Sequence, residues 1–168
     1  MDEAEQLMRI LSAEGTVSAA EKLSRLVELD RLRDPRVVPF VLNVVVDDAQ
    51  PNELRIHALR LLRNGRLARQ ERCDVADTFC KLLAGTSRSD LRLQAALALG
   101  EFTDVPHVLA VLGTVALADE QVDLRYAAFT SLQRGGATSE CVSLLRQLAR
   151  DETLGPSARR VLSSWRPT

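Results

Sequence analysis

A leucine, an alanine four residues later and a second leucine after four more residues recur along this chain. The three clear copies are Leu54, Ala58 and Leu62; Leu91, Ala95 and Leu99; and Leu124, Ala128 and Leu132. In each copy an acid precedes the first leucine and an arginine follows it. A spacing of four places the three side chains on one face of a helix, and copies at steps of about 30 to 40 residues are typical of stacked helical repeats. The chain is therefore predicted to fold as a helical array.

Two weaker copies extend the pattern toward both ends of the chain. The last one, Leu154, Ala158 and Leu162, has Gly155 where the arginine would be. A degenerate first copy is Gly15, Ala19 and Leu23. Counting both, we expect about five repeats.

Each repeat contains a second apolar segment with helical spacing, so each is predicted to be a helical hairpin. We call the helix with the leucine motif the inner helix and the helix before it the outer helix. Outer helices are expected at 2–13, 35–47, 70–84, 105–118 and 138–150, and inner helices at 16–29, 52–64, 89–101, 122–134 and 155–165. Many valines lie in 37–46, which favours a strand, but the surrounding helical period predicts a helix there.

Capping residues lie near most of these expected boundaries. Asp34 with Pro35, Asp104 with Pro106, and Thr138 are predicted to begin outer helices. Asn64-Gly65 and Gly135-Gly136 are predicted to end inner helices through a left-handed residue.

Composition bounds the class of protein. The chain has 168 residues, 46% of them hydrophobic, which suits one domain over 1–168 with repeats near 2–29, 35–64, 70–101, 105–134 and 138–165. Lys and Arg number 22 against 23 acids, so the net charge of −1 gives no overall attraction to nucleic acid or to an anionic membrane. The acidic N-terminus and the lack of a long apolar run predict a cytoplasmic protein without a membrane segment. Cys73, Cys80 and Cys141 show no metal or disulfide spacing and are expected to be buried free thiols.

The segment from Leu91 to Gly100, followed by Asp104, Pro106 and the next acid-Leu-Arg, resembles a HEAT-like repeat of the bacterial type that also occurs in phycobilisome lyase subunits. The resemblance implies an all-α fold, a right-handed α-solenoid of about five hairpins. It also implies that the inner helices line a concave surface that binds proteins.

The same resemblance implies a structural ladder near the turns within the repeats. Its arginines would be Arg55, Arg92 and Arg125, and its acids Asp48, Asp90, Asp119 and Asp123. Because Gly155 replaces the arginine of the last copy, the ladder is expected to end before the final repeat.

A non-catalytic scaffold is the function that these observations favour. Aligning the inner helices predicts a partner-binding surface made of His57, Arg60, Arg63, Gln94, Leu97, Tyr126, Thr130 and Arg134. Tyr and Arg are common at the centres of protein interfaces. The expected partner is a protein or a peptide, and no cofactor is expected, because the sequence has no phosphate loop, nucleophile elbow or paired catalytic carboxylates.

Three other functions compete with this prediction. A bilin-lyase-like subunit or accessory is suggested only by the type of repeat. Nucleic-acid association is suggested by the basic region Arg55–Arg72, in which Glu71 is the only acid, although Asn64-Gly65 interrupts it and a solvated face is the simpler interpretation. A zinc site from His57, Cys73 and Cys80 matches no standard spacing. The iron-binding HEAT-like hydroxylases use paired His-Glu motifs, which this sequence lacks.

Overall fold

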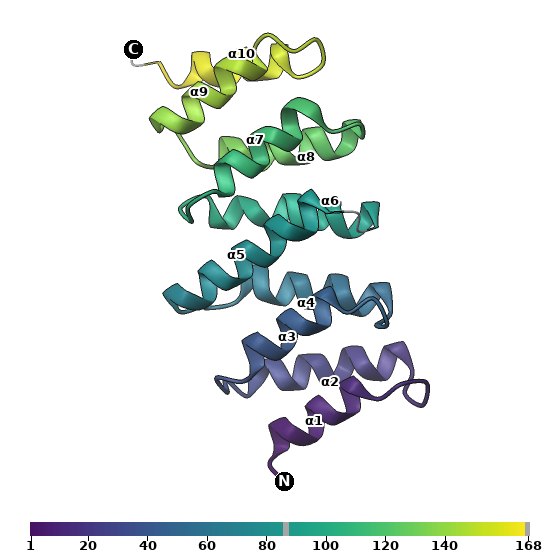
Figure 1. Cartoon of the computed structure of the whole chain (residues 1–168). Helices are drawn as coiled ribbons and strands as arrows, with labels where there is room; N and C mark the ends of the chain where they lie inside the picture. The colour runs from purple at the N-terminus through teal and green to yellow at the C-terminus, as the bar shows by residue number, and fades with distance from the viewer. Residues whose placement is uncertain (86–87, 167–168) are drawn as a thin grey trace. The chain divides into compact units, whose positions relative to one another are not determined.

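The computed structural model describes residues 1–85 and 88–166. Over that range the regular elements are ten α-helices and one short 3-10 helix, with no strand (Figure 1). The helices form two compact units, a first unit of residues Met1–Glu71 and a second unit of Arg72–Thr168. The all-helical prediction is confirmed, whereas a single domain over 1–168 stays a prediction.

The first unit consists of two helical hairpins. Its helices are α1 (Glu3–Ser12), α2 (Ala19–Arg31), α3 (Val37–Val46) and α4 (Asn52–Asn64). Helix α1 packs on α2, α3 packs on α4, and the two inner helices α2 and α4 contact each other. Leu11, Leu26, Leu29, Val45 and Leu59 are fully buried at the centre of this unit. The valine-rich segment is therefore a helix, because its apolar side chains are needed for packing against α4.

The second unit contains the remaining hairpins. Its helices are α5 (Arg69–Ala84), of which the first residues belong to the first unit, α6 (Ser89–Ala98), the 3-10 helix η1 (Leu99–Phe102), α7 (Val108–Ala118), α8 (Val122–Gln133), α9 (Ser139–Leu148) and α10 (Gly155–Ser164). Helices α7 and α8 pair, α9 and α10 pair, and the inner helices α6 and α8 pack against each other. Phe79 of α5 meets Phe102 edge to face, with ring centroids 5.9 Å apart.

The leucine motif is the packing face of the inner helices. All nine side chains of the three clear copies are at most 4% exposed. The central alanine lets the neighbouring helix approach closely while the leucines fill the space on either side. The repeat therefore marks equivalent positions in successive hairpins, as predicted.

The first repeat has a different register from the predicted one. Gly15 lies in a loop with φ of +73°, and Ala19 and Leu23 are only half-buried. The buried side chains of α2 are instead Lys22, Leu26 and Leu29. The prediction was wrong because Lys22 occupies the place of the arginine, so that the acid-Leu-Arg signal is missing from this helix.

Thr138 begins its helix as predicted, but two other starts differ. The Thr138 hydroxyl accepts a hydrogen bond from the Cys141 amide at 3.3 Å. Asp34 instead accepts the amide of Arg36 in a turn, and α3 begins only at Val37. Helix α7 begins at Val108, three residues later than expected, because His107 before it is left-handed with φ of +74°.

Of the two helix ends predicted to contain a left-handed glycine, one is confirmed and one is not. Gly136 is left-handed, with φ of +74°, as predicted. Gly65 ends α4 in an extended conformation with φ of −73°, so the left-handed prediction was wrong there.

Candidate protein-binding surface

An arginine ladder joins the inner helices to the ends of the outer helices. Arg55 Nε donates to the Val45 carbonyl at 2.8 Å, Arg92 Nε to that of Leu83 at 2.9 Å, and Arg125 Nε to that of Ala116 at 2.8 Å. The last carbonyls of a helix have no partner within it, and a cation near them is favoured by the helix dipole. Each arginine therefore stabilises the end of the outer helix of its own hairpin.

The same guanidinium groups hold acids, but not all of the acids that the resemblance implied. Arg55 Nη1 lies 3.4 Å from Asp48, as expected. Arg92 pairs with Asp119 at 2.7 Å and Arg125 with Asp151 at 2.5 Å. Asp119 and Asp151 lie in the turn of the following hairpin, so these two pairs connect successive hairpins of the second unit.

Asp90 and Asp123 are not the acids of these pairs. Asp90 accepts a hydrogen bond from the Leu91 amide and pairs with Arg88 at 3.5 Å, while Asp123 is exposed. The physical reason is the spacing, because residues two apart on a helix do not face each other.

The ladder also extends beyond its predicted ends. In the first unit, buried Lys22 takes the arginine's place and donates to Gln50 Oε1 at 3.0 Å, and Gln50 Nε2 donates to the Leu11 carbonyl. In the last hairpin, Arg159 donates to the Ala149 carbonyl at 2.7 Å. Arg159 is one helical turn beyond the glycine, so it replaces the missing arginine and the expected end of the ladder at Gly155 was wrong.

Burial alone would raise the pKa of Asp119, but the Gln121 amide and Arg92 outweigh it, so that the pKa lies below the usual 3.8. The Leu154 amide, together with Arg125 and the Thr153 amide, likewise lowers the pKa of Asp151. Both carboxylates are therefore held ionised, which preserves their ion pairs with Arg92 and Arg125.

In the second unit, four of the predicted binding residues lie on the adjoining helices α6 and α8, and a fifth follows α8. Gln94 and Leu97 are half-buried on α6, and Tyr126 and Thr130 are exposed on α8. Arg134 follows α8 and pairs with Glu101 at 2.8 Å. The Thr130 hydroxyl donates to the Tyr126 carbonyl within its own helix, which leaves the tyrosine as the main chemical feature.

Two apolar side chains that the sequence analysis did not select belong to the same surface. Val122 is 50% exposed and Tyr126 is 43% exposed, one turn apart on α8. Leu93 and Leu97 are half-buried one turn apart on α6. The signal that could have found Val122 and Leu93 is their spacing of four from Tyr126 and Leu97. We call these four side chains the inner surface of the second unit.

The other predicted binding residues lie on α4 in the first unit. Arg60 is exposed, and Arg63 and His57 are half-buried. His57 Nε2 is buried and has no hydrogen-bond partner among the described residues. Half-buried Ile56 occupies the position that corresponds to Leu93 and Tyr126, so this helix also presents an apolar side chain at that register.

The basic region Arg55–Arg72 does not form one uniform surface. Arg55 is 6% exposed and belongs to the ladder. Arg72 pairs with Asp104 at 2.6 Å and lies over the Phe102 ring at 4.9 Å. Both ends of the region therefore serve the fold.

The thiols and possible metal ligands complete the chemical inventory. Only Cys141 is fully buried, whereas Cys73 and Cys80 are half-buried, which corrects the expectation of three buried thiols. Burial raises the pKa of Cys80 and of Cys141 to about 11, which makes both poor nucleophiles.

Within residues 1–85 and 88–166, no three His, Cys, Asp or Glu side chains are grouped so that they could hold a metal. No helix in that range is long and apolar enough to span a bilayer.

Hairpins with equivalent leucine faces and a repeated arginine contact define an α-helical repeat protein. HEAT repeats match residues 38–133, which is more than half of the chain. The chain belongs to the HEAT repeat family. No curated protein matches it. Members of this family are commonly scaffolds for protein interactions, and the match itself identifies neither an activity nor a partner.

Proposed function

We propose that the chain is a non-catalytic scaffold that binds a protein or a peptide on its inner helices, with the inner surface of the second unit as the main contact. The observation that carries the proposal is the exposure of Val122 and Tyr126 on one side of α8. Leu93 and Leu97 continue the apolar surface on α6, which packs beside α8.

The register of the repeat supports this assignment. The residue immediately after the ladder cation is apolar in four successive inner helices: Leu23, Ile56, Leu93 and Tyr126. Each of these side chains is half-buried or exposed. Fold stability does not require an apolar residue on the side of a helix that faces solvent, and contiguous exposed apolar area is typical of an interaction site. A segment bound to the second unit would cover Leu93 and Tyr126 and contact the guanidinium group of Arg134 at one edge.

Site-specific photo-crosslinking tests the proposal. A photoreactive amino acid at position 126 is expected to capture a protein partner in the native cell, because this side chain lies within the proposed contact. The same group at Thr114, an exposed residue of the outer helix α7, is the matched control. Val122→Ser should reduce capture at position 126, whereas Val46→Ser should not, since Val46 is similarly exposed (47%) but lies on the outer helix α3. Equal capture from positions 126 and 114 would contradict the proposal.

Neither alternative function is favoured by a specific contact. A bilin-lyase-like role is tested by producing the chain together with a bilin and its acceptor protein; chromophore transfer would support it. Nucleic-acid association through Arg60, Arg63, Arg66 and Arg69 predicts retention on a nucleic-acid column that falls steeply with salt and with alanine at these positions.

A further inference from the structure

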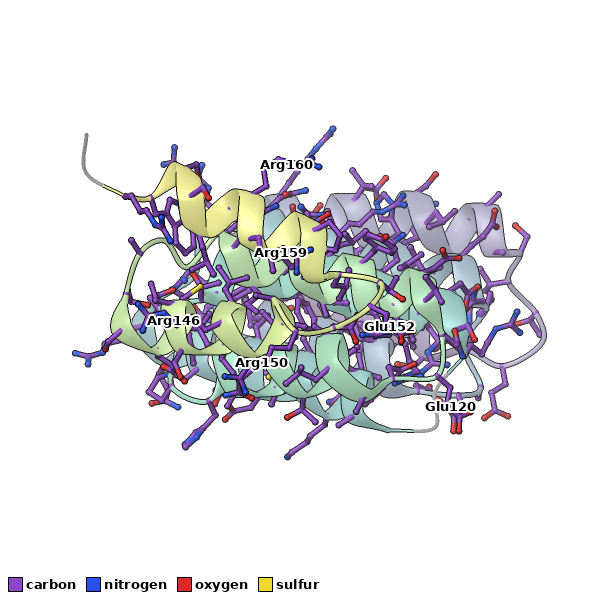
Figure 2. All side chains as sticks on the ribbon, turned by 90° about the horizontal axis from the view of Figure 1, so that it is seen from above. Glu120, Arg146, Arg150, Glu152, Arg159 and Arg160 are labelled. Atoms are coloured by element: carbon purple, nitrogen blue, oxygen red, sulfur yellow. The ribbon has the colours of Figure 1, made fainter. Side chains whose placement is uncertain are left out.

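The last hairpin, α9 with α10, presents an arginine-rich face at one end of the second unit. Figure 2 shows Arg146 and Arg150 along α9 and at its end, and Arg159 on α10, with Glu152 at the turn between the helices. Arg146, Arg150 and Arg159 are exposed. No ion pair joins any of the three to an acid among the described residues, and Arg159 donates only to the Ala149 carbonyl. We call these three residues the arginine face.

Aligning the last hairpin with the one before it shows which positions of the repeat the three arginines occupy. The equivalent carbonyl contacts of Arg125 and Arg159 align Ala116 of α7 with Ala149 after α9. In that register Arg146 corresponds to Gly113, and Arg150 to Leu117. The leucine motif similarly aligns Arg159 with Phe129.

Two of the three corresponding positions of α7 and α8, Gly113 and Phe129, are buried, while Leu117 is half-buried. Gly113 is buried, and a Cβ added there would lie 2.7 Å from Cδ2 of Leu144 in the following hairpin. Phe129 is only 6% exposed. The arginine face is therefore the side of the last hairpin that corresponds to the stacking side of the hairpin before it.

These three positions are apolar in each of the three preceding repeats. They are occupied by Leu42, Val46 and Leu59; by Cys80, Ala84 and Ala96; and by Gly113, Leu117 and Phe129. Only in the last repeat are all three arginine. The change places positive charges where the preceding repeats have apolar residues, of which those aligned with Arg159 are buried and those aligned with Arg150 are exposed or half-buried.

Solubility alone does not explain why the three charged residues of this face are all positive. A soluble surface is usually polar, with charges of both signs interspersed. The first hairpin of this chain has such a surface, because Arg25 pairs with Glu28 at 3.0 Å and Arg9 with Glu5 at 3.1 Å. At the last hairpin no acid among residues 88–166 forms an ion pair with the three arginines, so they are available for an external anion.

We propose that the arginine face binds an acidic peptide segment of a partner protein, as a second contact independent of the inner surface. Guanidinium groups form paired hydrogen bonds with carboxylates, and exposed arginines on two adjoining helices can engage several carboxylates of one segment. A peptide fits better than nucleic acid, because the whole chain has a net charge of −1 and only 4% aromatic residues.

Fluorescence anisotropy with a labelled peptide of alternating Glu and Ser tests this proposal on the full chain. Binding is expected to weaken as salt rises, and Arg146→Gln, Arg150→Gln and Arg159→Gln together should weaken it about tenfold. The triple variant removes the Arg159 contact to Ala149 and could unfold for that reason. The double variant Arg146→Gln with Arg150→Gln keeps this contact, and it is also expected to bind the peptide more weakly than the original chain does. A triple variant with Gln at Arg31, Arg66 and Arg69, which are exposed arginines of the first unit, changes the net charge equally and is expected to bind as the original chain does.

Four results would overturn the proposal. The first is that the original chain does not bind the peptide, and the second is that the double variant binds it as tightly as the original chain does. The third is that the control variant loses as much affinity for the peptide as the triple variant. The fourth is that a thymidine oligonucleotide binds as tightly as the peptide through the same arginines. Light scattering adds a fifth, since multimers that the double variant abolishes would make a second copy of the chain the occupant. The photo-crosslinking from position 126 reports on the inner surface alone, so failure of either contact is distinguished from failure of the other.

Discussion

At the scale of the residue, Gly155 shows how one position is determined by its neighbours. A Cβ at this position would lie 2.9 Å from the Ala149 carbonyl oxygen and 3.2 Å from Nη1 of Arg159. The glycine therefore leaves room for Arg159 to reach that carbonyl from one turn further along α10. The glycine at position 155 and the arginine at position 159 therefore belong together, because Arg159 can make the ladder contact only when position 155 has no side chain.

Gly155→Ala is expected to destabilise the fold by about 1 kcal/mol, because the added methyl group meets a backbone carbonyl that cannot move freely. Gly155→Arg, which restores the repeat pattern in the sequence, should be worse, since Arg159 already occupies the carbonyl. Urea unfolding measures both. Ser163→Ala, at an exposed position of the same helix, is the control and should leave stability nearly unchanged. A more stable Gly155→Arg variant would contradict this account.

The central alanines are determined by close approach of the helices. Ala128 is fully buried between Leu124 and Leu132. Ala128→Leu is expected to cost roughly 1–3 kcal/mol through overpacking. A lower thermal midpoint with a retained helical circular-dichroism spectrum is the expected result. Ala110→Leu, on the exposed side of α7, adds the same atoms without a packing cost and serves as its control.

At the scale of the element, the period of the sequence predicted the helices better than their boundaries. Helix α3 forms despite its valines, since one face of it is needed for packing against α4. The start of α7 was missed, because the left-handed His107 has no signature in the sequence. The helix register of α2 was missed since Lys22 carries out the arginine's role with a different partner.

The resemblance implied Asp48 and Asp119 as acids of the ladder, but Asp151 was not predicted. Asp119 and Asp151 lie 27 and 26 residues from their arginines, so only the stacking of hairpins brings them together. Of the binding surface, Tyr126 was identified by residue type. Val122 was not, because its exposure depends on how α8 lies against α6.

The ladder makes the stability of the second unit depend on pH. The pKa of Asp151 in the folded chain is below 3.8, so its contacts stabilise the fold above about pH 4 and this stabilisation is lost as the pH falls through the folded pKa. Asp151→Asn should lower the free energy of unfolding by about 1 kcal/mol at neutral pH and by progressively less below pH 4. Urea midpoints across this range measure the difference. Glu120→Gln, in the exposed turn before α8, should show no such trend. A constant difference at all pH values would count against the ladder.

At the scale of the whole molecule, a repeat array distributes its stability over neighbouring hairpins. Each unit has its own buried core, around Leu29 and Val45 in the first and around Phe79 and Leu132 in the second. In such arrays, stability is approximately a sum of contributions from each repeat and from each contact between neighbours. A local change should therefore act mainly on the hairpins that touch it.

A matched pair of substitutions tests whether the chain unfolds as one domain. Leu29 and Leu132 occupy the same position of the repeat in different units, and both are fully buried. Replacing either with Ala should cost about 2–5 kcal/mol by leaving a cavity. Because stability is local in a repeat array, Leu132→Ala is expected to accelerate amide hydrogen exchange mainly in α6 to α10, and Leu29→Ala mainly in α1 to α4. Equal acceleration of all helices by both variants would instead establish a single cooperative domain over 1–168.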